Sequence, residues 1–501
     1  MKSLTAAVLA LPLAALAAGP TTPDAGTLLQ QLKPVAPPEP ASTQPPVLKP
    51  PAKAAQPASP SAPFLVRAIR ITGNTLFDTA TLHALVADAE GQPLTLAQLE
   101  AVAERITTYY QTHGQPLARA IVPAQTVREG TLTIEVVEAR YGQVSLSNQS
   151  RVRSGLLQNM LSPLRSGQFV EQDALDRVLL LASDLPGTRM EATLKPGDAV
   201  GTSDLAVSAA TAAATAGVAS LDNFGNRYTG RARAGASVNV FNLLGYGDTL
   251  GVSALTSGAG LHYLRGSYES LVNGQGTRLG AAYANVYYRL GKSLSDLDAH
   301  GTADVGSLWA SHPLLRRRDR NVYGRLGYDH KQLRDHIDKT ALQTDRQLDN
   351  WTLSLNGDWR DALLGGGLNG WNVSWTTGQV DFRNAAAQEA DQTTARTAGG
   401  FSKWNASFSR VQGLTPNHSV YLMAAVQAAS GNLDSSEKWS AGGPYSVRAY
   451  DTGALSGDAG QVLTLEYRYD FAPAALGQWQ AQVFFDTARV TVNQDPWASG
   501  R

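Results

Sequence analysis

The second half of the chain alternates polar and apolar residues over segments of roughly 10 to 15 positions. In 231–240, arginine, serine and asparagine occupy one face, and alanine and valine occupy the other. In 463–471, Thr464, Glu466 and Arg468 oppose leucine, tyrosine and phenylalanine. Such long segments, apolar on one face and charged on the other, are typical of a transmembrane β-barrel with a wet lumen. A soluble β-domain is the alternative, but its strands are usually shorter.

About thirteen segments of this kind can be counted. They begin near residues 215, 229, 247, 260, 276, 299, 320, 347, 368, 400, 418, 460 and 480. Bacterial single-chain barrels have an even number of strands, because both ends of the barrel lie on the periplasmic side. The chain also ends in a loop-like stretch from Pro496 to Arg501. The sequence therefore predicts an antiparallel barrel over 211–501 that is incomplete at its C-terminus.

A small α+β module is predicted in front of the barrel, over residues 64–139. Asp78 can cap a first helix. Thr95 and Gln98 form a capping-box pattern at the start of a second helix, which Gly114 ends. Strands are expected at 64–72, 117–122 and 131–137, so the element order is β-α-α-β-β.

The same order recurs over residues 140–210. A strand at 142–147 is followed by helices at 152–160 and 172–183, and then by strands at 189–194 and 203–208. Two modules in tandem explain this repetition better than one larger domain.

The N-terminal region is expected to be exported and unstructured. Residues 1–18 combine Lys2, an apolar stretch and a small-x-small site, as a secretory signal peptide does. Residues 19–63 form a linker, with 11 prolines between Pro34 and Pro63. The short apolar run 28–32 is either a plug helix or part of a disordered tail.

Composition excludes several functions. Lysine plus arginine equals aspartate plus glutamate, 42 each, which argues against a nucleic-acid partner. The chain has no cysteine, and its eight histidines fit no metal-ligand spacing. Neither a nucleophile elbow nor a phosphate-binding loop is present. The sequence therefore predicts no enzyme and no cofactor.

Several short motifs, taken in order, resemble one family. The later barrel contains two of them, Gly442–Tyr450 and Val483–Asp486. The modules and the barrel entry contain the others: Ile71–Thr75, Val122–Gln125, Leu175–Arg177, Leu181–Gly187 and Asp222–Arg227. Together they resemble the outer-membrane transporters of two-partner secretion, the haemolysin secretion/activation proteins.

This resemblance implies two periplasmic POTRA domains and a barrel of sixteen strands, of which about three would be missing here. The expected partner is a large secreted β-helical exoprotein of adhesin or haemolysin type, and the expected location is the outer membrane. Outer-membrane lipids and the barrel-insertion machinery would be further partners. An assembly factor that inserts other barrels is the alternative, whereas a diffusion porin has no reason to carry the two modules.

The resemblance also implies a functional site. In the family, a long extracellular loop folds into the lumen, and the arginine at its tip pairs with an acidic residue of the wall. The corresponding tip here is Val447, Arg448, Ala449 and Tyr450, and the expected wall residues are Asp486 and Phe484, which share a face by alternation. Ala449 replaces the usual glycine and would be strained at positive φ. The alternatives are a solvated Arg448 and an Asp486 without a specific partner.

Overall fold

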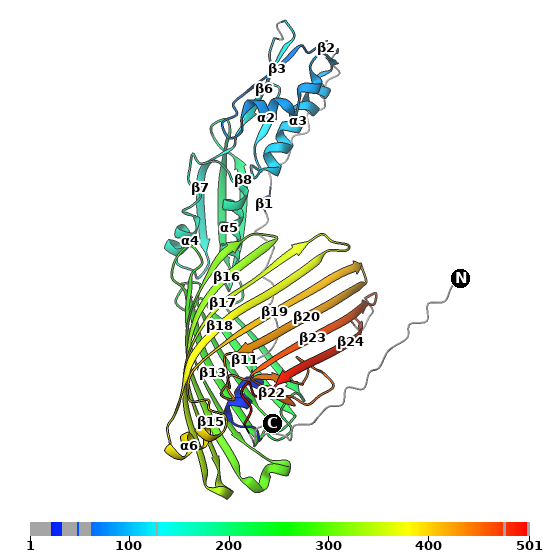
Figure 1. Cartoon of the computed structure of the whole chain (residues 1–501). Coiled ribbons are helices and arrows are strands. Elements are labelled where there is room, and N and C mark those ends of the chain that lie inside the picture. Colours follow the sequence, from blue (N-terminus) through cyan, green and yellow to red (C-terminus); the bar gives the residue numbers. More distant parts are fainter. Residues whose placement is uncertain (1–21, 33–47, 50–61, 127–128, 474–476, 498–501) are drawn as a thin grey trace, which may run out of the picture.

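The computed structural model describes residues 22–32, 48–49, 62–126, 129–473 and 477–497. The predicted signal peptide and most of the proline-rich linker lie outside these residues. Two small α/β modules stand on one end of a strongly curved sheet of thirteen strands (Figure 1). Within the described ranges, no helix is both long and apolar enough to cross a membrane.

The first module contains a three-stranded sheet in the order β3-β6-β5. Helix α3 starts with the predicted capping box between Thr95 and Gln98. The predicted strand at 64–72 is divided in two, because its first part pairs with β4 and its second part with β6. The elements are β2 (Phe64–Leu65), β3 (Ala68–Thr72), α2 (Thr79–Ala84), η1 (Ala87–Ala89), β4 (Pro93–Leu94), α3 (Leu96–Thr112), β5 (Arg119–Ile121) and β6 (Thr131–Val137).

The second module repeats this order, and its helix α5 has the predicted bounds. Its elements are β7 (Arg140–Gln149), α4 (Ser154–Leu161), α5 (Gln172–Ser183), β8 (Thr188–Pro196) and β9 (Thr202–Thr211). A further strand, β1 (Leu48–Lys49), comes from the linker and pairs in parallel with the edge of β8. The sequence does not predict β1, because backbone pairing of two residues requires no side-chain pattern.

The large sheet is antiparallel throughout, and each of its strands pairs with the next strand of the sheet along the chain. Thirteen strands were predicted and thirteen are found, with starts that differ by at most five residues from the prediction. They are β10 (Thr215–Asp222), β11 (Arg233–Phe241), β12 (Thr249–Thr256), β13 (Leu261–Leu271), β14 (Arg278–Arg289), β15 (Ala299–Arg316), β16 (Arg320–Ile337), β17 (Leu342–Asp361), β18 (Gly367–Phe382), β19 (Gly399–Thr415), β20 (His418–Ala429), β23 (Ala459–Asp470) and β24 (Gln480–Thr491).

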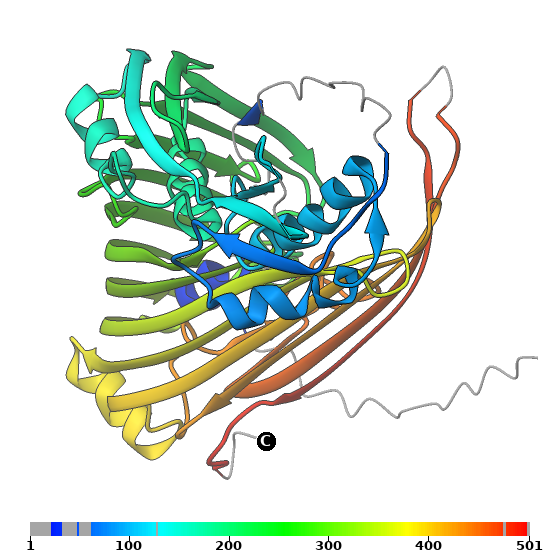
Figure 2. The same cartoon turned by 90° about the horizontal axis from the view of Figure 1, so that it is seen from above.

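The two edges of this sheet are β10 and β24, and no ladder joins them in the described part of the chain. Viewed from above, the sheet is strongly curved, with β24, in red, at one edge (Figure 2). The predicted unpaired seam is therefore present. A total of sixteen strands stays a prediction of the family resemblance.

The two faces of the curved sheet differ in polarity, as the faces of a membrane barrel do. The convex face exposes large apolar side chains, including Leu353 and Leu355, and the tryptophans Trp351 and Trp404. Trp351 packs against Tyr328, and Trp404 packs against Trp375. An apolar outer face with exposed aromatic residues is typical of a barrel surface that contacts the membrane. The concave face carries the polar residues and forms the lumen.

The second module is attached to the barrel rim by charge pairs. The turn between β15 and β16 carries Arg316, Arg317 and Arg318, and each arginine pairs with one aspartate of the α5 region. Arg316 is 1% exposed and holds Asp184 with two hydrogen bonds of 2.8 Å. These pairs place the modules over the end of the barrel where strands β15 and β16 meet.

In the barrel region, four smaller elements were not predicted. They are helix α6 (Ala385–Thr393), the one-turn helices η2 (Lys292–Leu297) and η3 (Asp338–Thr340), and the short hairpin of β21 (Trp439–Ala441) and β22 (Leu455–Gly457). All four lie in loops at the end of the barrel opposite the modules. Helix α1 (Ala25–Gln31) confirms the helical alternative for the apolar run near residue 28.

Candidate functional site: the lumen loop and its anchors

The site is the long loop 430–458 between β20 and β23, which lies on the concave side of the sheet. Its first limb is buried. Glu437 is 3% exposed and receives a hydrogen bond of 2.7 Å from Asn350. Two buried lysines, Lys331 and Lys403, also pair with the Glu437 carboxylate. Three strands, β16, β17 and β19, therefore bind one side chain of the loop.

The loop then forms the hairpin β21–β22, whose tip contains the predicted motif. Gly442 and Gly443 have φ values of 101° and 97°, which favour glycine. Tyr450 donates a backbone hydrogen bond of 3.1 Å to the carbonyl of Val447 and closes a turn. Val447 packs against Met423 and Val462 of the wall. Tyr450 itself is 60% exposed.

Ala449 lies inside this turn without backbone strain. It is not among the non-glycine residues with positive φ in the described chain. The alanine that replaces the family's glycine therefore adds a methyl group to an exposed position and requires no unfavourable conformation.

Arg448 is held by two carboxylates of the barrel wall. Its Nε and its second terminal nitrogen donate to Asp486 over 2.8 and 2.9 Å, and its backbone N–H donates to the same carboxylate over 3.2 Å. The other terminal nitrogen donates to Glu466 over 2.5 Å. The guanidinium also lies over the ring of Phe484, 3.5 Å from its centre.

The register of the last two strands creates this site. Thr464 of β23 is paired with Asp486 of β24, and Glu466 is paired with Phe484. Both carboxylate side chains are 4% exposed. Bidentate pairing of arginine with carboxylate is strong and directional, and it stabilises the partly buried Arg448 guanidinium. Glu466 was missing from the predicted site, although the alternation of 463–471 already placed it on the polar face.

The loop also reaches the first hairpin of the barrel. Asp451 accepts two hydrogen bonds from Arg231, of 2.7 and 2.9 Å. Thr452 donates one of 2.8 Å to the carbonyl of Phe224. The loop tip thus connects β23 and β24, at one edge of the sheet, to the β10–β11 turn at the other edge.

Helix α1 occupies the remaining space beside the loop (dark blue in Figure 1). Asp24 caps it by accepting from the Thr27 amide. Leu28 and Leu29 are 2% and 6% exposed and pack against lumen-facing residues of β14 to β17. A methyl group on Gly26 would lie only 2.6 Å from the backbone nitrogen of Ser436, so glycine lets the helix approach the loop this closely.

The described residues contain no group of three or more histidines or carboxylates that could hold a metal ion. The site consists of paired charges, hydrogen bonds and aromatic contacts. Such a site can hold a loop inside a pore.

Comparison with known proteins identifies the family to which this architecture belongs. Residues 201–498 match the family described as haemolysin secretion/activation protein ShlB/FhaC/HecB, and residues 64–139 match the ShlB-type POTRA domain. The chain belongs to the haemolysin secretion/activation family. Members of this family are outer-membrane transporters that secrete an exoprotein partner. The chain is therefore a two-partner secretion transporter of the outer membrane, with its POTRA region in the periplasm.

Individual relatives agree. The chain is 26% identical to the heme/hemopexin transporter protein HuxB of Haemophilus influenzae over 410 residues, which cover 81% of the chain and 72% of HuxB. It is 26% identical to the outer membrane transporter CdiB of Escherichia coli over 449 residues, 87% of the chain and 74% of CdiB. The solved structure of CdiB from E. coli shares the fold, with a TM-score of 0.67 at 23% identity, over 91% of this chain and 84% of that one.

Proposed function

We propose that this transporter recognises its exoprotein unfolded, at the edges of its POTRA sheets, and passes it through a lumen that is gated by the Arg448 loop. The proposed partner is a large β-helical exoprotein of adhesin or haemolysin type. The proposed divisions are a signal peptide at 1–18, a linker at 19–63, POTRA domains at 64–139 and 140–210, and the barrel from 211. Outer-membrane lipids and the insertion machinery are the further proposed partners.

Strand addition is the proposed mode of recognition. An unfolded chain offers backbone hydrogen bonds along any extended segment, so an exposed sheet edge can bind it with little demand on sequence. In the first POTRA domain, β5 is an edge strand, and Ile121 on it is 43% exposed. In the second, the edge of β8 already pairs with an extended segment, β1. That pairing supports the idea that these edges accept added strands.

The anchored loop is the observation that carries the gating proposal. A folded loop tied to opposite sides of the lumen narrows the path of any translocating chain. Arg448 holds it to β23 and β24 through Asp486 and Glu466. Because an arginine left unpaired in a poorly hydrated lumen is costly, the tip stays in place until new contacts replace these pairs. We therefore assign Arg448 the role of the gate anchor, with Asp486 and Phe484 as its wall partners.

An assembly factor that inserts other barrels is the second candidate, since it would share the POTRA-and-barrel architecture. The match to the secretion family over 201–498 favours the transporter. The two candidates differ in cargo: one exoprotein for the transporter, and many barrel precursors for the assembly factor.

Site-specific photo-crosslinking tests the recognition proposal. A benzophenone residue replaces Ile121 on the β5 edge of the full chain, and a control carries it at Val200, which is 95% exposed in the turn before β9. We expect crosslinks from Ile121 to an unfolded exoprotein, and few from Val200. Equal crosslinking from both positions would exclude edge recognition at β5, and crosslinks to many barrel precursors would support the assembly factor.

A further inference from the structure

A single arginine stands on the lipid-facing side of the last strand. Along β24, Asp486, Ala488 and Val490 are the less exposed residues and face the lumen, whereas Thr487 and Arg489 are exposed on the opposite face. In the described part of the chain, no ion pair or hydrogen bond involves the Arg489 side chain. A lipid-facing arginine is costly at the bilayer centre and is tolerated only near the interface.

The depth of Arg489 in the membrane follows from its position along β24 and from its pairing with β23. β24 starts at the POTRA side with Gln480, and Arg489 is its tenth residue, whereas about 9 to 11 residues span a bilayer. Arg489 is paired directly with Gln461 of β23. Along β23, Gln461 lies eight positions from Tyr469, which belongs to an aromatic cluster at the periplasmic end of the strand. Eight positions correspond to about 26 Å along a strand, or about 20 Å across a membrane at the usual tilt. The backbone of Arg489 and Gln461 therefore lies in the outer half of the bilayer, from where the long arginine side chain reaches the outer-leaflet headgroups.

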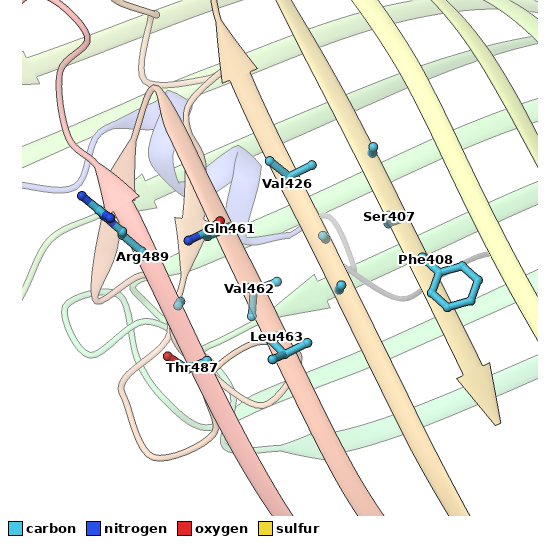
Figure 3. A pocket seen from close by; sticks show the side chains of 12 residues that line it. Ser407, Phe408, Val426, Gln461, Val462, Leu463, Thr487 and Arg489 are labelled. Carbon is cyan, nitrogen blue, oxygen red and sulfur yellow. The ribbon is translucent and has the colours of Figure 1, made fainter. Parts of the chain in front are cut away.

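A hollow lies beside this pair on the same face. Figure 3 shows it between strands β19, β20, β23 and β24, with Arg489 and Gln461 toward one end and Phe408 and Leu463 toward the other. Two hydrogen-bonded rows cross these strands. The outer row is Ala406, Val426, Gln461 and Arg489, and the row nearer the bilayer centre is Phe408, Ala424, Leu463 and Thr487.

The hollow arises because a small residue stands between two large ones. Ala424 lies between Phe408 and Leu463, and its short side chain leaves a depression between these two larger ones. Strand spacing places Ala424 on the order of 12 Å from Arg489, backbone to backbone, which is within the reach of one lipid molecule. Arg489 is the only charged residue among those that line the hollow.

We propose that this surface binds a phosphorylated lipid of the outer leaflet. The Arg489 guanidinium pairs with a phosphate, because arginine matches phosphate oxygens with two parallel hydrogen bonds. The Gln461 amide donates a further hydrogen bond to the same headgroup. One acyl chain lies in the hollow at Ala424, against Phe408 and Leu463. Because the residues that line the hollow include this positive charge and no acidic residue, they select an anionic headgroup over a zwitterionic one.

Native mass spectrometry of the full chain, extracted into detergent and titrated with bis-phosphorylated lipid A, tests the proposal. We expect Arg489→Gln to weaken retention roughly ten- to a hundredfold and Arg489→Lys to weaken it less. Ala424→Leu fills the hollow and should also weaken binding, although Arg489 is intact. Val373→Leu on β18 is the matched control, since Val373 faces lipid outside the hollow, and it should bind as the unmodified chain does.

The phosphate is tested separately with lipid A from which both phosphates have been removed. We expect the unmodified chain to retain this lipid no better than Arg489→Gln retains the phosphorylated one. Equal retention of the phosphorylated lipid by the unmodified chain and Arg489→Gln would overturn the proposal, and so would equal retention of the phosphorylated and dephosphorylated lipids. Circular dichroism confirms that each variant keeps its β-structure.

Discussion

The guanidinium of Arg346 on β17 donates a hydrogen bond of 3.0 Å to the carboxylate of Asp24, the residue that caps helix α1. The same guanidinium binds Asp335 of β16 over 2.6 Å and Asp434 of the loop over 2.8 Å. Ser435 donates to Asp24 as well, over 2.7 Å. One buried arginine therefore joins the barrel wall, the helix in the lumen and the loop 430–458.

Replacing Arg346 with alanine should release helix α1. Three carboxylates would remain close together without a cation, and breaking a buried ion pair in this way typically costs about 3 to 5 kcal/mol. Because the chain has no cysteine, Leu28→Cys reports the release through its rate of maleimide labelling. Leu28 is 2% exposed, so we expect slow labelling that becomes at least about tenfold faster with Arg346→Ala.

The control for this experiment is Arg334→Ala, which removes a half-exposed arginine paired with Asp304. Its labelling rate at Leu28→Cys should stay unchanged. If Arg346→Ala labels no faster than this control, the arginine does not hold the helix.

The Arg318–Asp176 pair should fix the second module on the barrel rim. Asp176 is 6% exposed and accepts from Arg318 Nε over 2.8 Å. Arg318→Asp places two carboxylates together, so hydrogen exchange in α5 should become faster. The exchanged pair Arg318→Asp/Asp176→Arg should restore slow exchange. Arg320→Asp is the control, since Arg320 lies 4.0 Å from the exposed Asp319 and its substitution should change little. Failure of the exchanged pair to restore protection would show that the pair is not the attachment.

The first POTRA domain should lose stability in acid through Glu138. Burial alone would raise the pKa of Glu138, but hydrogen bonds from the Thr75 hydroxyl and from the Leu76 and Thr75 amides hold that pKa below its ordinary value. The Tyr110 hydroxyl, 2.8 Å away, adds a fourth. A lowered folded pKa gives stability that is present above the unfolded pKa of about 4.3 and is lost as the pH falls through the folded value.

We therefore expect hydrogen exchange in 64–139 to be flat between pH 7 and about pH 5 after correction for intrinsic rates, and protection to fall at lower pH. Glu138→Gln should lower protection at pH 7 and remove most of this pH dependence. Glu135→Gln is the control, since Glu135 is exposed on β6 of the same module. An unchanged pH profile in Glu138→Gln would contradict this assignment.

Different parts of the structure were predictable for different physical reasons. The period-two alternation identified the strands and the lumen-facing position of Asp486, because a strand buries one face whatever its neighbours are. It could not show that Glu466 is the second partner of Arg448, since that depends on the register between β23 and β24. Nor could it predict Arg346 as a junction, because Asp24, Arg346 and Asp434 are far apart in sequence and meet only in the folded lumen.

The linker strand β1 and the loop hairpin β21–β22 illustrate a second limit. Both are two or three residues per strand and are held by backbone hydrogen bonds, which have no compositional signature. In contrast, the capping box at Thr95 was predictable from the sequence, because a helix start places specific side chains at fixed spacing.

Secretion of the exoprotein by cells that carry Arg448→Ala in the full-length transporter tests the gate anchor most directly. We expect exoprotein in the medium to fall to background, while the transporter level in the outer membrane stays normal. Arg448→Lys should secrete little, because lysine cannot pair with Asp486 and Glu466 at once. Arg227→Ala, in the exposed β10–β11 turn, should secrete normally. Normal secretion by Arg448→Ala would contradict the account.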